Sequence, residues 1–176
     1  MNYSLKSLGM VNCLGMKLDE IKKNLFAGDQ SGIIARGDLV PETTVLVGQV
    51  PGELATIPNE FKPYNCRNNQ ILLTAYQQIE LDVRAAKEQY GADRLAIILG
   101  SSTSGIASGE EALAYKAQHG DWPEDYEYIQ QEMSSISEFL SLYTGITGPS
   151  YTLSTACSSS GKAFASARNL LDMNIC

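Results

Sequence analysis

The sequence contains one histidine, no cluster of lysines and arginines, and no apolar run long enough to cross a membrane. The scarcity of histidine leaves the chain poor in the commonest kind of general base. The 20 acidic and 13 basic residues give a formal net charge of −7, whereas a nucleic-acid-binding protein needs a basic surface. A membrane span needs about 20 consecutive apolar residues. We therefore expect neither a nucleic acid nor a membrane as a partner.

Secretion and metal-binding patterns are missing as well. The N-terminal segment is broken by glycine and asparagine, and it lacks the longer apolar stretch and the small-residue cleavage site of a secretory signal. We expect a cytoplasmic protein. The four cysteines, Cys13, Cys66, Cys157 and Cys176, are far apart and form no C-x-x-C pair. Neither a zinc site nor a disulfide framework is predicted, and no metal or cofactor is expected.

Alternating helical and strand patterns occupy the rest of the sequence. A chain of 176 residues with 44% hydrophobic content can bury a core. The apolar run LAIIL lacks alternation, which is typical of a strand covered on both faces of a parallel sheet. We predict an α/β fold with a mixed, mostly parallel sheet and helices on both faces. The predicted strands begin at 3, 43, 95 and 151, the predicted helices cover 18–28, 70–90, 107–118, 129–144 and 158–173, and 51–69 is predicted as a loop.

The last predicted element is a helix, where an α/β unit would next need its returning strand. We therefore expect residues 1–176 to form one N-terminal domain that is truncated at its C-terminal end. Such a piece would have an unpaired sheet edge and an uncovered apolar face, and both features promote aggregation.

The strongest local motif is TACSSSG at 155–161, where a strand turns sharply into a helix with Cys157 at the junction. A thiol at a helix N-terminus faces unpaired backbone N–H groups and the positive end of the helix dipole, which stabilise a thiolate. The small neighbouring side chains allow a tight turn, and they let a substrate carbonyl reach both the sulfur and its backbone N–H, the oxyanion donor. Cys157 is thus the candidate nucleophile. A buried structural cysteine is the alternative interpretation.

Four blocks carry a family resemblance: GMVNCLG at 9–15, NLFAGDQSGI at 24–33, IILGSSTSG at 97–105 and GITGPSYTLSTACSSS at 145–160. Their order and spacing resemble the N-terminal part of the β-ketoacyl-(acyl carrier protein) synthases of the thiolase superfamily. The resemblance covers essentially the whole chain. It implies a thiolase-like fold, of which this chain supplies the first half of an α-β-α-β-α sandwich.

The resemblance also implies a reaction. In that family a cysteine takes an acyl group as a thioester, and malonyl-acyl carrier protein then decarboxylates and attacks it in a Claisen condensation during fatty acid, aryl polyene or polyketide elongation. Cys157 matches that nucleophile. The family's two catalytic histidines and its second oxyanion donor lie in the C-terminal half, and His119 matches neither histidine motif. We therefore expect this fragment alone to lack condensing activity and predict His119 to be a surface loop residue.

The implied partners are acyl carrier protein and a second subunit, either in a homodimer or in a heterodimer with a related synthase subunit. In the family the strand before the nucleophile, here 151–155, pairs across the dimer axis. Lys62, Arg67 and Lys162 are candidates for meeting an acidic carrier protein. Two alternatives stay open: a non-catalytic partner subunit resembling a chain-length factor, and a thiolase-type acyltransferase. The glycine-rich loop 100–109 is interpreted as a backbone turn, and the acidic stretch 121–127 as a solvated face.

Overall fold

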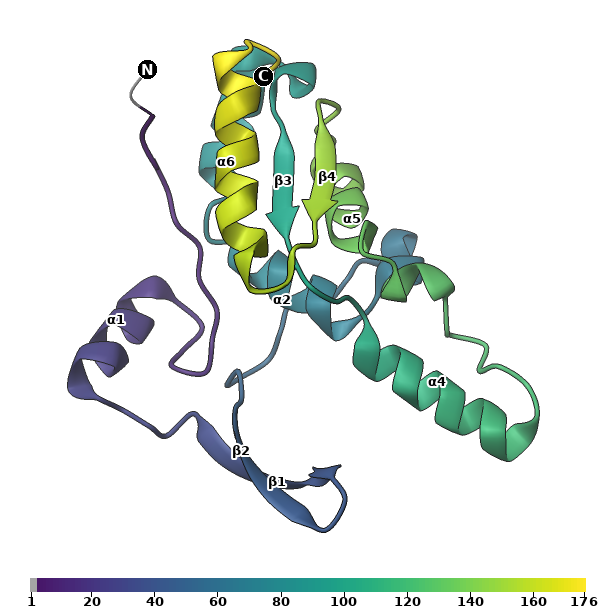
Figure 1. Ribbon diagram of the computed structural model, residues 1–176. Coiled ribbons are helices and arrows are strands. Elements are labelled where there is room, and N and C mark those ends of the chain that lie inside the picture. Colours follow the sequence, from purple (N-terminus) through teal and green to yellow (C-terminus); the bar gives the residue numbers. More distant parts are fainter. Residues whose placement is uncertain (1–2) are drawn as a thin grey trace.

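The computed structural model describes residues 3–176. At its centre two parallel strands, β3 (Ile97–Gly100) and β4 (Ser150–Leu153), lie between helix α6 (Ser159–Asp172) and helix α5 (Ser135–Thr144) (Figure 1). The register pairs each residue of β3 with one of β4, from the first residue of each strand to the last. The parallel pairing that the apolar run at 95–99 predicts is present.

Side chains of β4 alternate between the two helices. The Tyr151 hydroxyl lies 2.5 Å from Ser166 Oγ of α6. The next residue points the other way, and Thr152 Oγ1 donates to Ser137 Oγ of α5 at 2.9 Å. Successive side chains of a strand point to opposite faces, so one helix covers each face of this sheet, as the sequence predicts.

The hydrophobic core lies on the α5 side of the sheet, against helix α2 (Arg67–Tyr76) and the short helix η1 (Asn59–Tyr64). Phe139 of α5 is fully buried there, and its ring packs edge-on against Phe61 with the centroids 5.9 Å apart. Aromatic pairs of this kind add to the free energy gained by burial. The buried members of the core are Ile57, Leu73, Tyr76, Ile97, Phe139, Leu140 and Ile146.

The other elements surround or extend from this centre. Helix α3 (Glu80–Tyr90) follows α2, and helix α4 (Ile106–His119) extends away from the sheet (Figure 1). Helix α1 (Leu18–Ala27) and the antiparallel hairpin of β1 (Ile33–Val40) and β2 (Thr43–Gly48) lie below the central sheet in the view of Figure 1. No helix within residues 3–176 is long and apolar enough to span a membrane.

The long helix predicted over 70–90 is wrong, because the structure contains two helices. Helix α2 ends at Tyr76, and Ile79, with φ −118° and ψ 5°, is the non-helical residue before α3. Gln78 lies in the break, where its Nε2 donates to the carbonyls of Met10 and Met16, each at 3.0 Å. A side chain that binds the N-terminal segment thus occupies the point where the helix is interrupted.

Four other element predictions also need correction. The segment predicted as a loop over 51–69 contains the short helix η1, and its last residues, from Arg67 on, belong to α2. The segment predicted as one helix over 129–144 is a short helix η3 (Tyr128–Gln131) followed by α5, because Glu132 between them is extended. The opening segment forms no regular strand among the described residues before α1, only an isolated bridge between Asn12 and Gly15. Strand β1 was not predicted.

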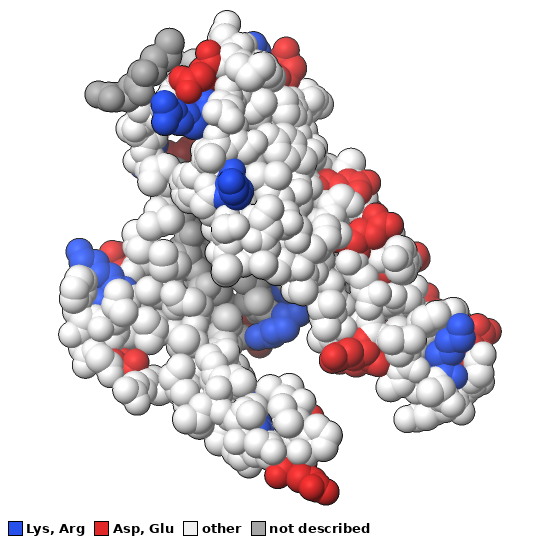
Figure 2. Space-filling model, viewed as in Figure 1, with Lys and Arg blue, Asp and Glu red and all other residues white. Residues whose placement is uncertain are grey.

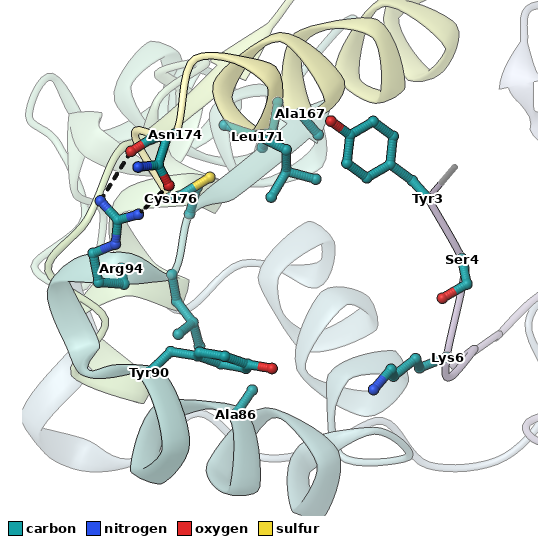
Figure 3. A pocket seen from close by; sticks show the side chains of 13 residues that line it. Tyr3, Ser4, Lys6, Ala86, Tyr90, Arg94, Ala167, Leu171, Asn174 and Cys176 are labelled. Atoms are coloured by element: carbon teal, nitrogen blue, oxygen red, sulfur yellow. Dashed lines mark hydrogen bonds between the residues drawn. The ribbon is translucent and has the colours of Figure 1, made fainter. Parts of the chain in front are cut away.

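Two cations bind the carbonyl ends of the helices beside the sheet. Lys87 Nζ donates to the carbonyl of Thr144, the last residue of α5, at 2.6 Å. Arg94 donates to the carbonyl of Asn174, just after α6, at 3.0 Å (Figure 3), and to the carbonyl of Ile175 at 3.2 Å. Positive charge at a helix C-terminus is favourable because the last carbonyls there lack partners within the helix. These contacts fasten the ends of α5 and α6 to the α3 side of the molecule.

A cavity of about 830 Å³ is lined by Leu95, Ala96 and Ile98 at β3 and by no residue of β4. Tyr3 and Lys6 of the N-terminal segment line one wall, and Tyr90, Leu171 and Cys176 line others (Figure 3). Residues 3–6 run opposite β3 across this space, but they do not pair with it. Within residues 3–176 the sheet therefore has an open edge next to the cavity.

Candidate active site

The predicted junction between strand and helix is present around Cys157. Strand β4 ends at Leu153, the short helix η4 (Ala156–Ser158) forms the turn, and α6 begins at Ser159. Ala156 has φ +53°, in the left-handed region that residues other than glycine rarely adopt. A strained backbone is found where the surrounding structure holds it, often at functional sites. The small side chain of Ala156 limits the strain next to the candidate nucleophile.

Cys157 is exposed and forms no disulfide, which contradicts its interpretation as a buried structural cysteine. Cys66, by contrast, is buried, and Cys13 and Cys176 are partly exposed. Cys157 lies two residues before the start of α6, a helix of 14 residues. The amide dipoles of that helix point their positive end toward the turn. An accessible sulfur at such a helix end is suited to nucleophilic attack on a carbonyl.

Side chains around the turn are small and polar. Ser158 Oγ donates to the carbonyl of Thr155 at 2.8 Å and lies 3.0 Å from Thr155 Oγ1. Both residues, like Cys157, are exposed. The residues next to Cys157 in the turn are therefore uncharged and exposed, and none of them has a bulky side chain that shields the sulfur.

His119 does not lie near this turn. It is the last residue of α4, whose far end points away from the N-terminus of α6 (Figure 1). Its ring stacks on Tyr115 with the centroids 4.0 Å apart, and its Nδ1 lies 2.9 Å from the carbonyl oxygen of Tyr115. The residue is exposed, as expected, but it belongs to a helix rather than to the predicted loop. The described residues thus give Cys157 no histidine partner.

The glycine-rich loop after β3 is held by its own contacts. Ser104 is buried and accepts a hydrogen bond from Asn68 Nδ2 at 3.3 Å. Gly105 has φ +53° and precedes α4, and an added Cβ would lie 2.2 Å from the carbonyl oxygen of Gln130. This glycine permits a close backbone approach that other residues would block. The loop has the form of the backbone turn that the sequence predicts.

The acidic stretch 121–127 is largely exposed beyond α4. Trp122 stacks on Tyr126 with the ring centroids 5.3 Å apart, and Lys116 Nζ lies 4.2 Å from the indole centroid. Figure 2 shows acidic side chains spread along this side of the molecule. The three basic candidates for carrier-protein contact, Lys62, Arg67 and Lys162, are all exposed as well.

A second feature flanks the candidate site, on the free edge of β4. A groove of about 760 Å³ runs between β4 and α5. Its charged residues are Glu132 and Glu138, both exposed, and no lysine or arginine lines it. Burial and a hydrogen bond to Glu138 raise the pKa of the nearby Tyr64 hydroxyl to about 12. The two glutamates make this groove acidic.

This pKa has a measurable consequence at alkaline pH. Because the folded-state pKa of Tyr64 lies above its ordinary value of 10.0, the neutral phenol stabilises the fold below pH 10, and this contribution is lost as the pH rises toward 12. We expect a tyrosinate absorbance step near pH 12 that Tyr64→Phe removes. Glu138→Gln should move that step to lower pH. A Tyr64 hydroxyl that ionises near pH 10 in the folded protein would contradict the hydrogen bond.

Comparison with known proteins places these features in a family. The sequence profile described as "Beta-ketoacyl synthase, N-terminal domain" matches residues 65–176. No curated protein sequence matches the chain. Among solved structures, a chain in the complex of the ketosynthase ApeO with its chain length factor ApeC from Xenorhabdus doucetiae is 40% identical, with a TM-score of 0.90 over 96% of this chain and 43% of that one.

A second solved structure is more distant. A beta-ketoacyl synthase from Burkholderia phymatum STM815 is 20% identical, with a TM-score of 0.71 over 94% of this chain and 42% of that one. This chain therefore spans less than half the length of either relative. The shared architecture confirms the predicted α/β, thiolase-like fold class. Because the family profile covers most of the chain and the fold is shared over nearly all of it, the protein belongs to the beta-ketoacyl synthase family.

Proposed function

We propose that Cys157 accepts an acyl group as a thioester and that this chain is the nucleophile-bearing N-terminal part of a condensing enzyme. The observation that carries the proposal is the position of the thiol: exposed, after a strained turn, at the N-terminus of a long helix, in a domain of this family. The acyl donor would be an acyl carrier protein or coenzyme A thioester. The extender would be malonyl-acyl carrier protein.

The acylation step follows from the geometry of the turn. The Cys157 thiolate attacks the thioester carbonyl and forms a carbon–sulfur bond, while the carbonyl electrons move onto oxygen. The backbone N–H of Cys157 donates to that oxyanion. When the oxyanion collapses, the bond to the donor's sulfur breaks, and the departing thiolate takes a proton from solvent. The acyl group is then held on Cys157.

The condensation step needs groups that residues 3–176 do not place at Cys157. Decarboxylation of a malonyl thioester generates an enolate, whose negative charge must be stabilised while it attacks the acyl-cysteine. No histidine of the described part of the chain lies at the turn, and a second oxyanion donor is expected from elsewhere in the enzyme. We propose that this chain performs acylation and that condensation requires the remainder of the synthase.

The acidic groove beside β4 favours the proposal that the partner is a related but different subunit, not a second copy of this chain. A strand edge presents unpaired backbone groups that a second chain can bind. If two copies of this chain paired through this groove, each would present Glu132 and Glu138 there, and like charges at an interface oppose association. A partner with lysine or arginine at this position would be favoured. The similar solved structure is a complex of the ketosynthase ApeO with its chain length factor ApeC. Because Cys157 is present and exposed, we propose this chain as the catalytic member of such a pair.

The experiment that tests the proposed function separates the two half-reactions. Residues 1–176 incubated with an acyl carrier protein thioester should gain the mass of one acyl group. Addition of malonyl-acyl carrier protein should then yield no β-ketoacyl product, because the groups that stabilise the enolate are missing. Failure to gain the acyl mass would contradict Cys157 as the acyl acceptor. A β-ketoacyl product formed by this chain alone would contradict the proposal that condensation requires the remainder of the synthase.

A further inference from the structure

Three consecutive serines follow Cys157, and only the middle one, Ser159, is buried, with 4% of its surface exposed. Its Oγ accepts the backbone N–H of Thr155 at 3.0 Å and donates to the backbone carbonyl of Ala156 at 2.6 Å. Ser158 and Ser160 are exposed. One hydroxyl therefore bonds to the backbone on both sides of the strained residue Ala156.

The bond to Ala156 orients the peptide group that contains the proposed oxyanion donor. The Ala156 carbonyl and the Cys157 N–H belong to the same peptide plane, and in a trans peptide they point in opposite directions. A hydrogen bond that fixes the carbonyl therefore also fixes the direction of the N–H. The backbone N–H of Ser159 donates to the same Ala156 carbonyl, so this oxygen is held by two donors from one residue.

Gly100 provides the space in which Ser159 lies. An added Cβ at Gly100, the last residue of β3, would lie 2.6 Å from the Ser159 carbonyl carbon and 2.7 Å from both the Ser159 oxygen and the Ser160 nitrogen. Contacts this short with backbone atoms force the strand and the helix apart. The missing side chain at Gly100 thus lets the first turn of α6 approach the end of β3.

We infer that Ser159 is a positioning residue for acylation. Its hydroxyl holds Ala156 in the left-handed conformation and aims the Cys157 N–H at the carbonyl under attack, and Gly100 keeps Ser159 in place. The inference rests on the proposed role of Cys157. Ser159 itself does not react, and it acts only through the orientation of the Ala156–Cys157 peptide.

The inference separates two reactions of the same thiol. Acylation passes through an oxyanion and needs the Cys157 N–H in position, whereas alkylation by iodoacetamide displaces iodide and forms no oxyanion. Removing an oxyanion donor outright costs about 10²- to 10³-fold in rate, so a donor that is present but misdirected should cost about 10- to 100-fold. Ser159→Ala should therefore slow acylation of Cys157 by about 10- to 100-fold and change its alkylation rate by less than about 3-fold.

The test measures both rates at Cys157 in three variants and in the parent chain, with circular dichroism to confirm folding. Ser160→Ala removes an exposed neighbouring hydroxyl and should leave both rates unchanged. Gly100→Ala keeps the Ser159 hydroxyl but displaces it, and it should reproduce the selective loss of acylation. Equal acylation in Ser159→Ala and the parent would overturn the inference, as would parallel loss of acylation and alkylation in both Ser159→Ala and Gly100→Ala. A parent chain that is alkylated but not acylated at Cys157 would instead overturn the proposed function.

Discussion

Replacing Cys157 by alanine is expected to reduce acyl transfer to the chain by more than about 10³-fold, because the variant has no sulfur to carry the thioester. The measurement is the intact mass of the chain after incubation with an acyl carrier protein thioester. The turn should survive the change, because Cys157 is exposed and alanine is compatible with the short helix η4. The variant should therefore remain folded but should not gain the mass of an acyl group.

Cys176→Ala is the matched control for this variant. Cys176 is a partly exposed free thiol that lines the cavity beside β3 rather than the turn. Its removal should leave acyl transfer at the level of the parent chain. If Cys157→Ala still gained the acyl mass at the parental rate, the nucleophile would lie elsewhere.

Replacing Phe139 by alanine should cause the largest loss of stability, about 3–5 kcal/mol, because it removes a fully buried aromatic ring and leaves a cavity. Three aromatic side chains surround this ring, with centroids 5.8 Å (Tyr143), 5.9 Å (Phe61) and 6.2 Å (Tyr64) away. Domains are stable by only about 5–15 kcal/mol, so the variant should lose a large part of its folding free energy. Urea unfolding measures the change.

Leu142, three residues further along α5, provides the comparison. It is 52% exposed, so Leu142→Ala should change the free energy of unfolding by no more than about 0.5 kcal/mol. A Phe139→Ala midpoint equal to that of Leu142→Ala would show that the aromatic cluster does not form the core.

The sequence predicted elements whose determinants are local. The unbroken apolar run of β3 and the one-sided apolar pattern of α6 both indicate their structures directly, and both elements are found within one or two residues of the expected positions. The break between α2 and α3 has a distant cause. Gln78 binds the carbonyls of Met10 and Met16, more than 60 residues away in the chain. The helical periodicity over 70–90 cannot indicate such distant contacts.

The opening segment was predicted as a strand on its local pattern, but a strand needs an adjacent edge to pair with. Residues 3–6 lie across a cavity from β3 instead of beside it. β1 was missed because Gly37 and Asp38 interrupt its apolar pattern. Its pairing with β2 shows a register irregularity between Arg36 and Val40, next to these residues.

The candidate nucleophile could be predicted from the sequence, but the residues that hold it in position could not. A cysteine at a junction of strand and helix, flanked by small side chains, identifies Cys157. The sequence does not distinguish Ser158, Ser159 and Ser160, because their different burial depends on how closely α6 approaches Gly100. The left-handed Ala156 is likewise not visible in sequence, since alanine is an unusual residue for that conformation.

The most direct test of the central claim is to locate the acyl group. The folded chain is incubated with an acyl carrier protein thioester, digested, and examined by tandem mass spectrometry of the four cysteine-containing peptides. The acyl group should be found on the peptide that contains Cys157 and on none of those that contain Cys13, Cys66 or Cys176. An acyl group on another cysteine, or one distributed among all four, would contradict the assignment of Cys157 as the acyl acceptor.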